Sequence, residues 1–234
     1  MKRLDVSVPA ESRNKARELI LSGNVTVNGE VITKPSALVS DEARIEVISA
    51  PKYVGRAGYK LETAVEAFGI DFTGLICLDA GAAVGGFTDL MLQGGAEKIY
   101  AADVGENQLH VSLRENPRVV NLEKQDIRNL KLPEQVDFIT ADLSFISLRL
   151  IIPSFAEFLK PAGRCAVLIK PQFELGKRHI KNGVVTDIKL ISKAVRDIET
   201  FISESRYERI GTIESKLNEK GRNSEFICYF KVKS

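Results

Sequence analysis

The sequence predicts an α/β protein with two parts, a large Rossmann-like sheet and a small N-terminal α+β domain. Beyond about position 51, apolar runs typical of strands alternate with segments of helical periodicity, the pattern of a parallel sheet covered by helices on both faces. The first fifty residues lack this alternation and predict a helix, a hairpin and one further strand. A chain of 234 residues, 44% of them hydrophobic, is long enough for two separate cores.

The N-terminal helix is predicted from a cap, an apolar stripe and a stop signal. Ser12 can accept a hydrogen bond from the first turn, and Gly23 can end the helix. Between them, Ala16, Leu19 and Ile20 recur at i, i+3 and i+4 and predict one buried face.

A hairpin should follow this helix, because Asn28-Gly29 lies between two short apolar runs and favours a tight two-residue turn. Residues Ile45–Ile48 predict another strand, and Pro51 marks a linker. We therefore expect a small domain over 1–50, a linker over 51–59 and a large domain over 60–234.

The large domain should contain seven strands, of which the last two form an antiparallel pair. Most of the runs are separated by segments long enough for crossover helices, whereas only the polar stretch Lys216–Asn223 separates the last two. A helix carrying Leu61, Ala64, Val65 and Phe68 at i, i+3, i+4 and i+7 should pack on the sheet. The strands are predicted at Leu75–Asp79, Lys98–Asp103, Val119–Leu122, Val136–Ala141, Arg164–Ile169, Tyr207–Ser215 and Ser224–Lys231.

A glycine-rich loop follows the first of these strands and predicts a cofactor site. The loop lies at the carboxyl edge of the sheet, where α/β folds bind cofactors. The strict dinucleotide spacing is absent, because Ala83 occupies the second glycine position. Asp79 would repel a pyrophosphate but favour the ammonium of a methionine-like moiety, and Asp103, 22 positions after Gly81, can accept two ribose hydroxyls. S-adenosylmethionine fits both acids, NAD fits one, and a tight turn without a ligand is the remaining interpretation.

Four charged residues should meet at the same edge. Asp142 and Lys170 follow the fourth and fifth strands, Glu225 lies on the antiparallel seventh strand, and Lys60 precedes Leu61 on the first helix. Each alone fits a surface ion pair. Together they place two lysines and two carboxylates in one cleft, where a lysine of lowered pKa can accept a proton.

Composition argues against several other chemistries. The three cysteines are far apart within apolar runs and predict buried thiols, so neither a disulfide framework nor a metal site is expected. With only two histidines, we do not expect a Ser/His/Asp triad. No stretch is apolar and long enough to span a bilayer, and no signal peptide is present, so we expect a cytoplasmic protein with no membrane partner.

A net charge of +2 does not by itself indicate a nucleic-acid-binding protein, so the prediction of RNA binding depends on where the cations lie. Arg13 and Arg17 are spaced i, i+4 on one helix face and can straddle phosphates. Phe173 can stack on a base. The residues predicted to contact RNA are Arg3, Arg13, Lys15, Arg17, Arg56, Phe173, Lys177 and Arg178.

Six stretches of the sequence, in this order, resemble the TlyA-type proteins, which are often labelled hemolysins and are similar to FtsJ-like ribose 2′-O-methyltransferases. They are GRAGYKLE (Gly55–Glu62), LDAGAAVGGFTD (Leu78–Asp89), ADVGENQL (Ala102–Leu109), DLSFISL (Asp142–Leu148), IKPQFE (Ile169–Glu174) and NSEFICYF (Asn223–Phe230). The resemblance spans nearly the whole chain.

The resemblance implies a methyltransferase sheet with an S4-like N-terminal domain whose first helix is shortened. It implies S-adenosylmethionine as the cofactor, ribosomal RNA or ribosomal subunits as the partner, and the ribose 2′-hydroxyl of a cytidine as the acceptor. The implied catalytic tetrad is Lys60, Asp142, Lys170 and Glu225. The expected cofactor contacts are Asp79, Gly81, Ala83, Gly85, Gly86, Phe87, Asp103, Asp126 and Asp142.

Two other classes of function stay open at this point. One is an RNA-binding or ribosome-assembly protein with a degenerate cofactor pocket, which Ala83 and Val84 favour because they lack polar groups. The other is the membrane-damaging activity that the hemolysin label suggests, for which the sequence contains no spanning or strongly basic amphipathic segment.

Overall fold

The computed structural model of the chain describes residues 1–234 with the exception of 49–51, 177–178, 181, 217–222 and 234. The chain forms two compact units, Met1–Lys52 and Tyr53–Ser234, called the N-terminal unit and the C-terminal unit below. Each has its own apolar core.

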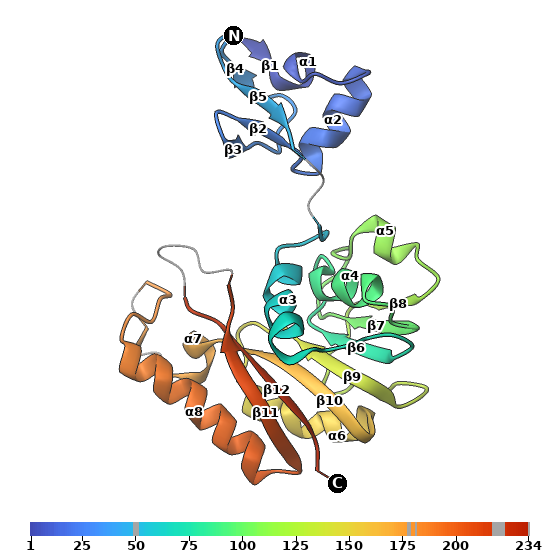
Figure 1. Cartoon of the computed structure of the whole chain (residues 1–234), viewed down its shortest axis with the longest axis vertical. Coiled ribbons are helices and arrows are strands. Elements are labelled where there is room, and N and C mark those ends of the chain that lie inside the picture. The colour runs from blue at the N-terminus through green and yellow to red at the C-terminus, as the bar shows by residue number, and fades with distance from the viewer. Residues whose placement is uncertain (49–51, 177–178, 181, 217–222, 234) are drawn as a thin grey trace. The chain divides into compact units, whose positions relative to one another are not determined.

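The N-terminal unit combines short helices with two small sheets (Figure 1). In one sheet β2 lies between β3 and β5, and in the other β1 pairs with β4, all antiparallel. Its elements are β1 (Lys2–Arg3), α1 (Leu4–Ser7), α2 (Arg13–Leu21), β2 (Val25–Val27), β3 (Glu30–Val31), β4 (Leu38–Val39) and β5 (Ile45–Val47).

Local sequence signals explain these elements. The Ser12 side chain accepts a hydrogen bond from the Lys15 backbone N–H at 3.2 Å, which confirms the predicted cap of α2. Asn28 and Gly29 have φ values of 53° and 85°, as a tight turn between β2 and β3 requires, which confirms the hairpin. Ile20 and the other apolar residues of the α2 stripe pack against the small sheets.

The C-terminal unit is a seven-stranded sheet in the order β11-β12-β10-β9-β6-β7-β8. Strands β6 to β10 are parallel, and β12 is antiparallel to both β10 and β11, which confirms the predicted antiparallel pair. The elements are α3 (Ala57–Phe68), β6 (Ile76–Ala80), α4 (Gly86–Gln93), β7 (Lys98–Ala102), α5 (Val111–Arg114), β8 (Val119–Leu122), β9 (Val136–Ala141), α6 (Phe155–Phe158), β10 (Leu159–Ile169), α7 (Pro171–Glu174), α8 (Ile188–Glu204), β11 (Tyr207–Glu214) and β12 (Phe226–Val232), with short 3₁₀ turns at Leu148–Leu150 and Ile152–Ser154.

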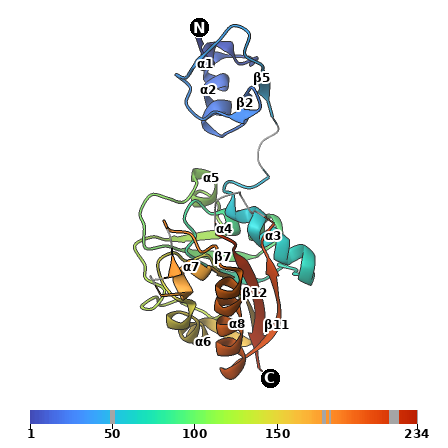
Figure 2. The same ribbon diagram turned by 90° about the vertical axis from the view of Figure 1, so that its left-hand side faces the viewer.

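Two apolar clusters cover the two faces of this sheet, because successive strand residues point to opposite sides. Leu78 and Ile139 belong to the cluster that includes α8, whereas their neighbours Cys77 and Phe138 belong to the cluster that includes α3 and α4. Helices α3 and α8 both contact β11 and β12, and Figure 2 shows α8 beside these strands. All three cysteines are buried in these clusters, as predicted.

The structure corrects the expected linker over 51–59. Tyr53 is 5% exposed, and its hydroxyl donates to Glu62 Oε1 at 3.0 Å. A Cβ at Gly58 would lie 2.5 Å from Tyr53 Cγ, so the glycine makes room for the ring on α3. Because α3 also begins at Ala57, positions 53–59 belong to the C-terminal unit.

Two further differences concern the sheet. Strand β10 begins at Leu159 instead of the expected Arg164, with irregular pairing to β9 between these residues. The connection 123–135 from β8 to β9 crosses without a helix, although it is long enough for one. Both regions contain residues that favour turns, and a prediction based on apolar runs alone does not take them into account.

Candidate active site

The carboxyl edge of the parallel strands positions the site. Asp142 follows β9 and Lys170 follows β10, so both emerge at this edge. Because β12 is antiparallel to β10, Glu225, directly before β12, lies at the same edge. Lys60 reaches the edge from α3, which packs beside β12.

The four side chains form one continuous chain of ion pairs. Lys60 Nζ lies 2.7 Å from Glu225 Oε2 and 3.4 Å from Asp142 Oδ2. Lys170 Nζ lies 2.5 Å from the other oxygen of Asp142, Oδ1. The structure therefore brings together the four residues that the sequence placed at one edge.

The lysines of this cluster are largely removed from water. The side chain of Lys170 is 9% exposed and that of Lys60 is 17% exposed. Burial of Lys60 lowers its pKa, but the carboxylates of Asp142 and Glu225 outweigh this and hold its pKa above the ordinary value. Lys60 is therefore charged at neutral pH. The carboxylate of Asp142 lies between the two ammonium groups.

Lys170 has two further neighbours that the sequence analysis did not identify as partners. Its Nζ donates to Ser144 Oγ at 3.1 Å and lies 5.8 Å from the centre of the Phe173 ring. Ser144 belongs to the segment that follows β9. Its position two residues after Asp142 was the available signal, because residues directly after a parallel strand share its edge.

The segment after β9 also presents an aromatic side chain that sequence reasoning missed. Phe145 is 91% exposed and has φ 64°, a conformation that is costly for a bulky residue. Its ring lies 5.1 Å from that of Phe173. The two rings flank the approach to Lys170, where an unpaired base can stack.

Glu174 fixes this segment to α7. Its carboxylate accepts hydrogen bonds from Ser147 Oγ at 2.5 Å and from the Leu148 backbone N–H at 2.9 Å. Burial raises the pKa of Glu174 despite these hydrogen bonds. The contact ties the segment that carries Asp142 to the helix that follows Lys170.

A cavity of about 550 Å³ opens beside the cluster at the glycine-rich loop. Gly81, Ala83, Asp103, Asp126 and Asp142, all predicted cofactor contacts, line it. Asp142 therefore belongs both to the cavity and to the ion-pair cluster.

Gly81 lets the glycine-rich loop pack closely against the segment that follows β9. Gly81 has φ 83°, and a Cβ there would lie 2.6 Å from the Asp142 carbonyl oxygen. Asp103 accepts hydrogen bonds from the backbone N–H groups of Ala83 at 2.9 Å and Gly105 at 2.7 Å. These bonds hold the acid at the mouth of the loop. Asp126 pairs with Arg128 at 2.5 Å, and this hydrogen bonding lowers the pKa of Asp126 to about 2.

Asp79 does not line the cavity. Its side chain is fully buried and accepts hydrogen bonds from Thr88 Oγ1 at 2.6 Å and Thr140 Oγ1 at 3.0 Å. Burial raises its pKa to about 6 against the opposing effect of the two hydroxyl donors. The sequence placed this acid in contact with a ligand, whereas the structure places it in the core, where it binds side chains of α4 and β9.

Gly85, Gly86 and Phe87 also lie outside the cavity lining and serve packing. A Cβ at Gly85 would lie 2.3 Å from Leu113 Cδ1, and one at Gly86 would lie 2.7 Å from Gly58 N. Phe87 is 3% exposed within the core. The glycines are required because α4 approaches its neighbours closely, which a glycine pattern alone does not distinguish from ligand contact.

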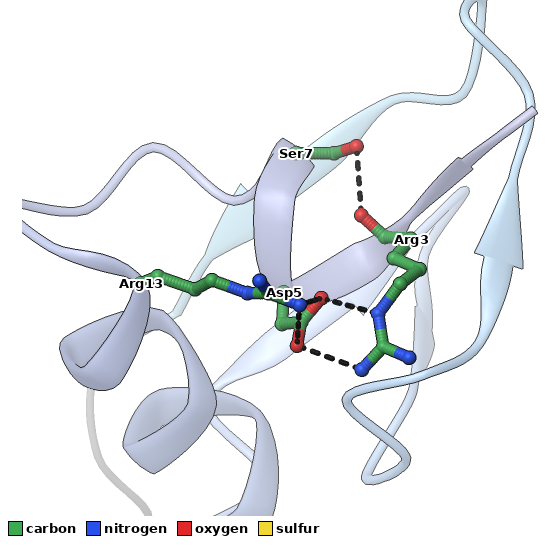
Figure 3. A network of polar contacts seen from close by, with 4 residues as sticks. All are labelled: Arg3, Asp5, Ser7 and Arg13. Atoms are coloured by element: carbon green, nitrogen blue, oxygen red, sulfur yellow. Dashed lines mark hydrogen bonds and ion pairs between the residues drawn. The ribbon is translucent and has the colours of Figure 1, made fainter.

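Three of the arginines predicted for RNA contact, Arg3, Arg13 and Arg17, lie on the surface of the N-terminal unit. Arg3 and Arg13 both pair with Asp5, at 2.9 Å and 3.2 Å, and Figure 3 shows them reaching this carboxylate from opposite sides. Arg17 is exposed one turn after Arg13 on α2.

The remaining predicted RNA contacts are dispersed. Lys15 pairs with Glu18 at 2.9 Å. Arg56 is exposed directly before α3, and Phe173 lies beside Lys170. A second open cavity of about 670 Å³ is lined in part by Phe145 and Phe173. Lys177 and Arg178 lie outside the described residues.

The sheet order, the ligand-sized cavity at the glycine-rich loop and the charged cluster beside it define a Rossmann-like methyltransferase. Residues 53–232 match the model of the FtsJ-like methyltransferases, and residues 2–45 match the S4 domain. The chain belongs to the FtsJ-like methyltransferase family and carries an N-terminal S4 domain.

Named relatives cover both units. The chain is 39% identical over 232 residues to the 16S/23S rRNA (cytidine-2′-O)-methyltransferase TlyA of Mycobacterium tuberculosis, across 96% of this chain and 86% of the relative. It is 39% identical to Hemolysin A of Brachyspira hyodysenteriae, across 94% of each protein. A solved structure described as a hemolysin from Streptococcus thermophilus is 34% identical and superposes with a TM-score of 0.78, across 100% of this chain and 89% of that one.

Within the described part of the chain, the helices fall short of the length and apolar character needed to cross a membrane.

Proposed function

We propose that the protein transfers a methyl group from S-adenosylmethionine to the 2′-hydroxyl of a cytidine in ribosomal RNA. The observation that carries the proposal is the cluster of Lys60, Asp142, Lys170 and Glu225, linked by contacts of 2.5–3.4 Å, at the wall of a ligand-sized cavity. Relatives that match nearly the whole chain include a named rRNA (cytidine-2′-O)-methyltransferase.

The cavity suits S-adenosylmethionine. Asp103 is placed to accept the ribose hydroxyls, Gly81 lines the cavity without a side chain, and Asp126 offers a second acceptor. When bound, S-adenosylmethionine supplies an electrophilic methyl group. Asp142 lies at the junction of this cavity with the charged cluster, so the acceptor hydroxyl should enter from the side of Lys170.

The environments of the two lysines favour different roles. Lys60 contacts two carboxylates, which hold its charge, so its role is to fix Asp142 and Glu225. Lys170 contacts one carboxylate, one hydroxyl and one aromatic ring. Lys170 Nζ is therefore the better candidate to receive the proton of the ribose hydroxyl, after its own proton has left to solvent.

Asp142 orients this step through Oδ1, which holds Lys170, while Oδ2 is held by Lys60. Phe145 and Phe173 are placed to stack on the acceptor base and exclude water from the hydroxyl. The N-terminal unit, with Arg3, Arg13 and Arg17 on its surface, supplies contacts to RNA phosphates. Because this RNA is ribosomal, the site of action is the cytoplasm.

The test is transfer of a labelled methyl group from S-adenosylmethionine to intact ribosomal subunits and to the isolated RNA. Digestion to nucleosides and mass spectrometry should identify 2′-O-methylcytidine. A wild-type protein that binds RNA but transfers no label to either substrate would support the RNA-binding module instead, and calorimetry with S-adenosylmethionine would then show whether the cavity binds it.

A further inference from the structure

Asp5 is the most deeply buried charged group of the N-terminal unit. Its side chain is fully buried, although it lies at the start of the short helix α1, close to the surface. The Asp5 backbone N–H donates to the Pro35 carbonyl at 3.0 Å, so the position of the carboxylate is fixed by the backbone of the loop before β4.

Both ion-pair partners of Asp5 reach it from outside this buried position (Figure 3). Arg3 donates through Nε to Oδ1 at 3.0 Å and through Nη2 to Oδ2 at 2.9 Å, a bidentate contact. Arg13 donates through Nη2 to both oxygens, at 3.4 Å and 3.2 Å. One carboxylate therefore holds a strand residue and a helix residue together.

The two arginine side chains remain partly in solvent. They are 44% and 57% exposed, whereas the carboxylate that they share has no exposed surface. Each guanidinium has five N–H donors and uses only part of them on Asp5. Each guanidinium therefore keeps donors that Asp5 does not use, on a side chain that is partly exposed to solvent.

Stability alone is a weak reason for such an arrangement, because apolar residues of similar size can replace a buried ion pair at little or no cost in stability. Orientation is a stronger reason. Two arginines held on one carboxylate lose little side-chain entropy when they bind a phosphate, and the carboxylate offsets their mutual repulsion.

We propose that Asp5 is a positioning residue for RNA, which holds Arg3 and Arg13 so that their outward donors bind backbone phosphates. This inference rests on the proposed function, because it requires RNA as the partner. Asp5 itself does not contact the RNA in this arrangement.

The sign of one substitution distinguishes this role from a simple effect of charge. Removing a negative charge from an RNA-binding surface should strengthen RNA binding if charge alone matters. With a positioning role, Asp5→Asn should instead weaken it, because the amide cannot hold two guanidinium groups.

Asp41→Asn is the matched control. Asp41 is in the same unit and pairs with Lys2 at 2.9 Å, but its side chain is 58% exposed and it does not contact the arginine pair. Both substitutions change the net charge equally and nearly preserve side-chain size.

The experiment measures binding of the full-length protein to ribosomal subunits over a range of salt concentrations. We expect Asp5→Asn to weaken binding at least about fivefold and to make the slope of log K against log salt shallower by about 0.7–0.9 for each phosphate that is no longer neutralised. Asp41→Asn should bind as well as the wild type or better, with an unchanged slope. Tight binding by Asp5→Asn, or equal weakening by Asp41→Asn, would overturn the proposal.

Hydrogen exchange on the N-terminal unit shows whether Asp5→Asn remains folded. If this variant unfolds, Arg3→Lys is tested in its place, because lysine keeps the charge but cannot make the bidentate contact. Wild-type affinity for Arg3→Lys, with an unchanged slope of log K against log salt, would overturn the proposal. Methyl transfer at saturating subunits is measured in parallel. Absence of transfer by the wild type defeats the proposed function, whereas wild-type binding by Asp5→Asn with normal transfer defeats only the role of Asp5.

Discussion

The ion-pair clusters described for the two units differ in which partner is buried. In the N-terminal unit the carboxylate of Asp5 is fully buried, while Arg3 and Arg13 are 44% and 57% exposed. In the C-terminal unit the lysines themselves are withdrawn from water, with Lys170 9% and Lys60 17% exposed.

Under the proposed function, this difference separates binding from chemistry. An exposed guanidinium keeps its charge and can exchange water for a phosphate, which suits recognition. A lysine removed from water has a proton affinity that its few neighbours set, which suits proton transfer. An ion pair with an exposed cation therefore suits phosphate recognition, whereas one with a buried cation suits proton transfer.

The largest expected effect comes from Asp142→Asn, which removes the one carboxylate that both lysines contact. We expect the single-turnover rate of methyl transfer to fall by about 10²–10⁴-fold, because the proton-accepting group loses its orientation. Rapid-quench assays at saturating RNA and cofactor measure this rate. Glu225→Gln is the control and should lower the rate less, because Glu225 pairs with Lys60 rather than with Lys170. A wild-type rate for Asp142→Asn would contradict the catalytic role proposed for the C-terminal cluster.

A smaller effect is expected at the cofactor cavity. Asp103→Ala should weaken binding of S-adenosylmethionine by about 1.5–3 kcal/mol, or about 10–150-fold, because a ribose diol loses its charged acceptor. Calorimetry measures the affinity, and NAD should not compete. Unchanged affinity would make Asp103 only a support for the loop, through its bonds to Ala83 and Gly105.

Removing residues 1–52 tests the division of labour between the units directly. The remaining chain keeps both apolar clusters of the large sheet, so it should fold and bind S-adenosylmethionine as the full chain does. Its affinity for ribosomal RNA should fall at least about tenfold at moderate salt, with a shallower salt slope. RNA binding equal to that of the full chain at every salt concentration would place recognition on the C-terminal unit.

The smallest expected effects are opposite dependences of stability on pH. Hydrogen bonding from Arg3 is the main cause that lowers the pKa of Asp5 from 3.8 to about 2, so its stabilisation is present above pH 3.8 and is lost as the pH falls towards 2. Burial raises the pKa of Asp79 from 3.8 to about 6. The stabilisation from its protonated side chain is therefore present below pH 3.8 and is lost as the pH rises through 6.

Urea unfolding across this pH range, with hydrogen exchange to resolve the units, measures the two dependences. Asp5→Asn should flatten the acid limb of the N-terminal unit, and Asp79→Asn should flatten the slope between about pH 4 and 6 in the C-terminal unit. Equal slopes before and after either substitution would show that the acid concerned does not titrate differently on folding.

The parallel strands with a final antiparallel pair and the convergence of Lys60, Asp142, Lys170 and Glu225 were predictable from sequence. Alternating apolar runs specify parallel strands, and residues after such strands must meet at one edge. The helix α2 and the hairpin of the N-terminal unit were equally predictable, because Ser12 and Asn28-Gly29 are local signals that need no tertiary context.

The roles within the loop were not predictable in the same way. Gly85 and Gly86 fit a ligand-binding pattern, but close packing of α4 requires them for a different reason. Asp79 has the right spacing yet is buried, with Thr88 and Thr140 as its hydrogen-bond partners. The exposure of Phe145 and the pairing of Asp5 with Arg3 and Arg13 depend on how neighbouring elements pack against one another, which no local pattern records.

The most direct test of this contrast is a single pair of constants for Lys170→Ala: the single-turnover rate of methyl transfer to ribosomal subunits, and the dissociation constant for the same subunits. If the buried cluster carries the chemistry and the N-terminal arginines carry the binding, the rate should fall by about 10²–10⁴-fold while the dissociation constant stays at the wild-type value. A wild-type rate for Lys170→Ala would contradict the role given to the buried lysine.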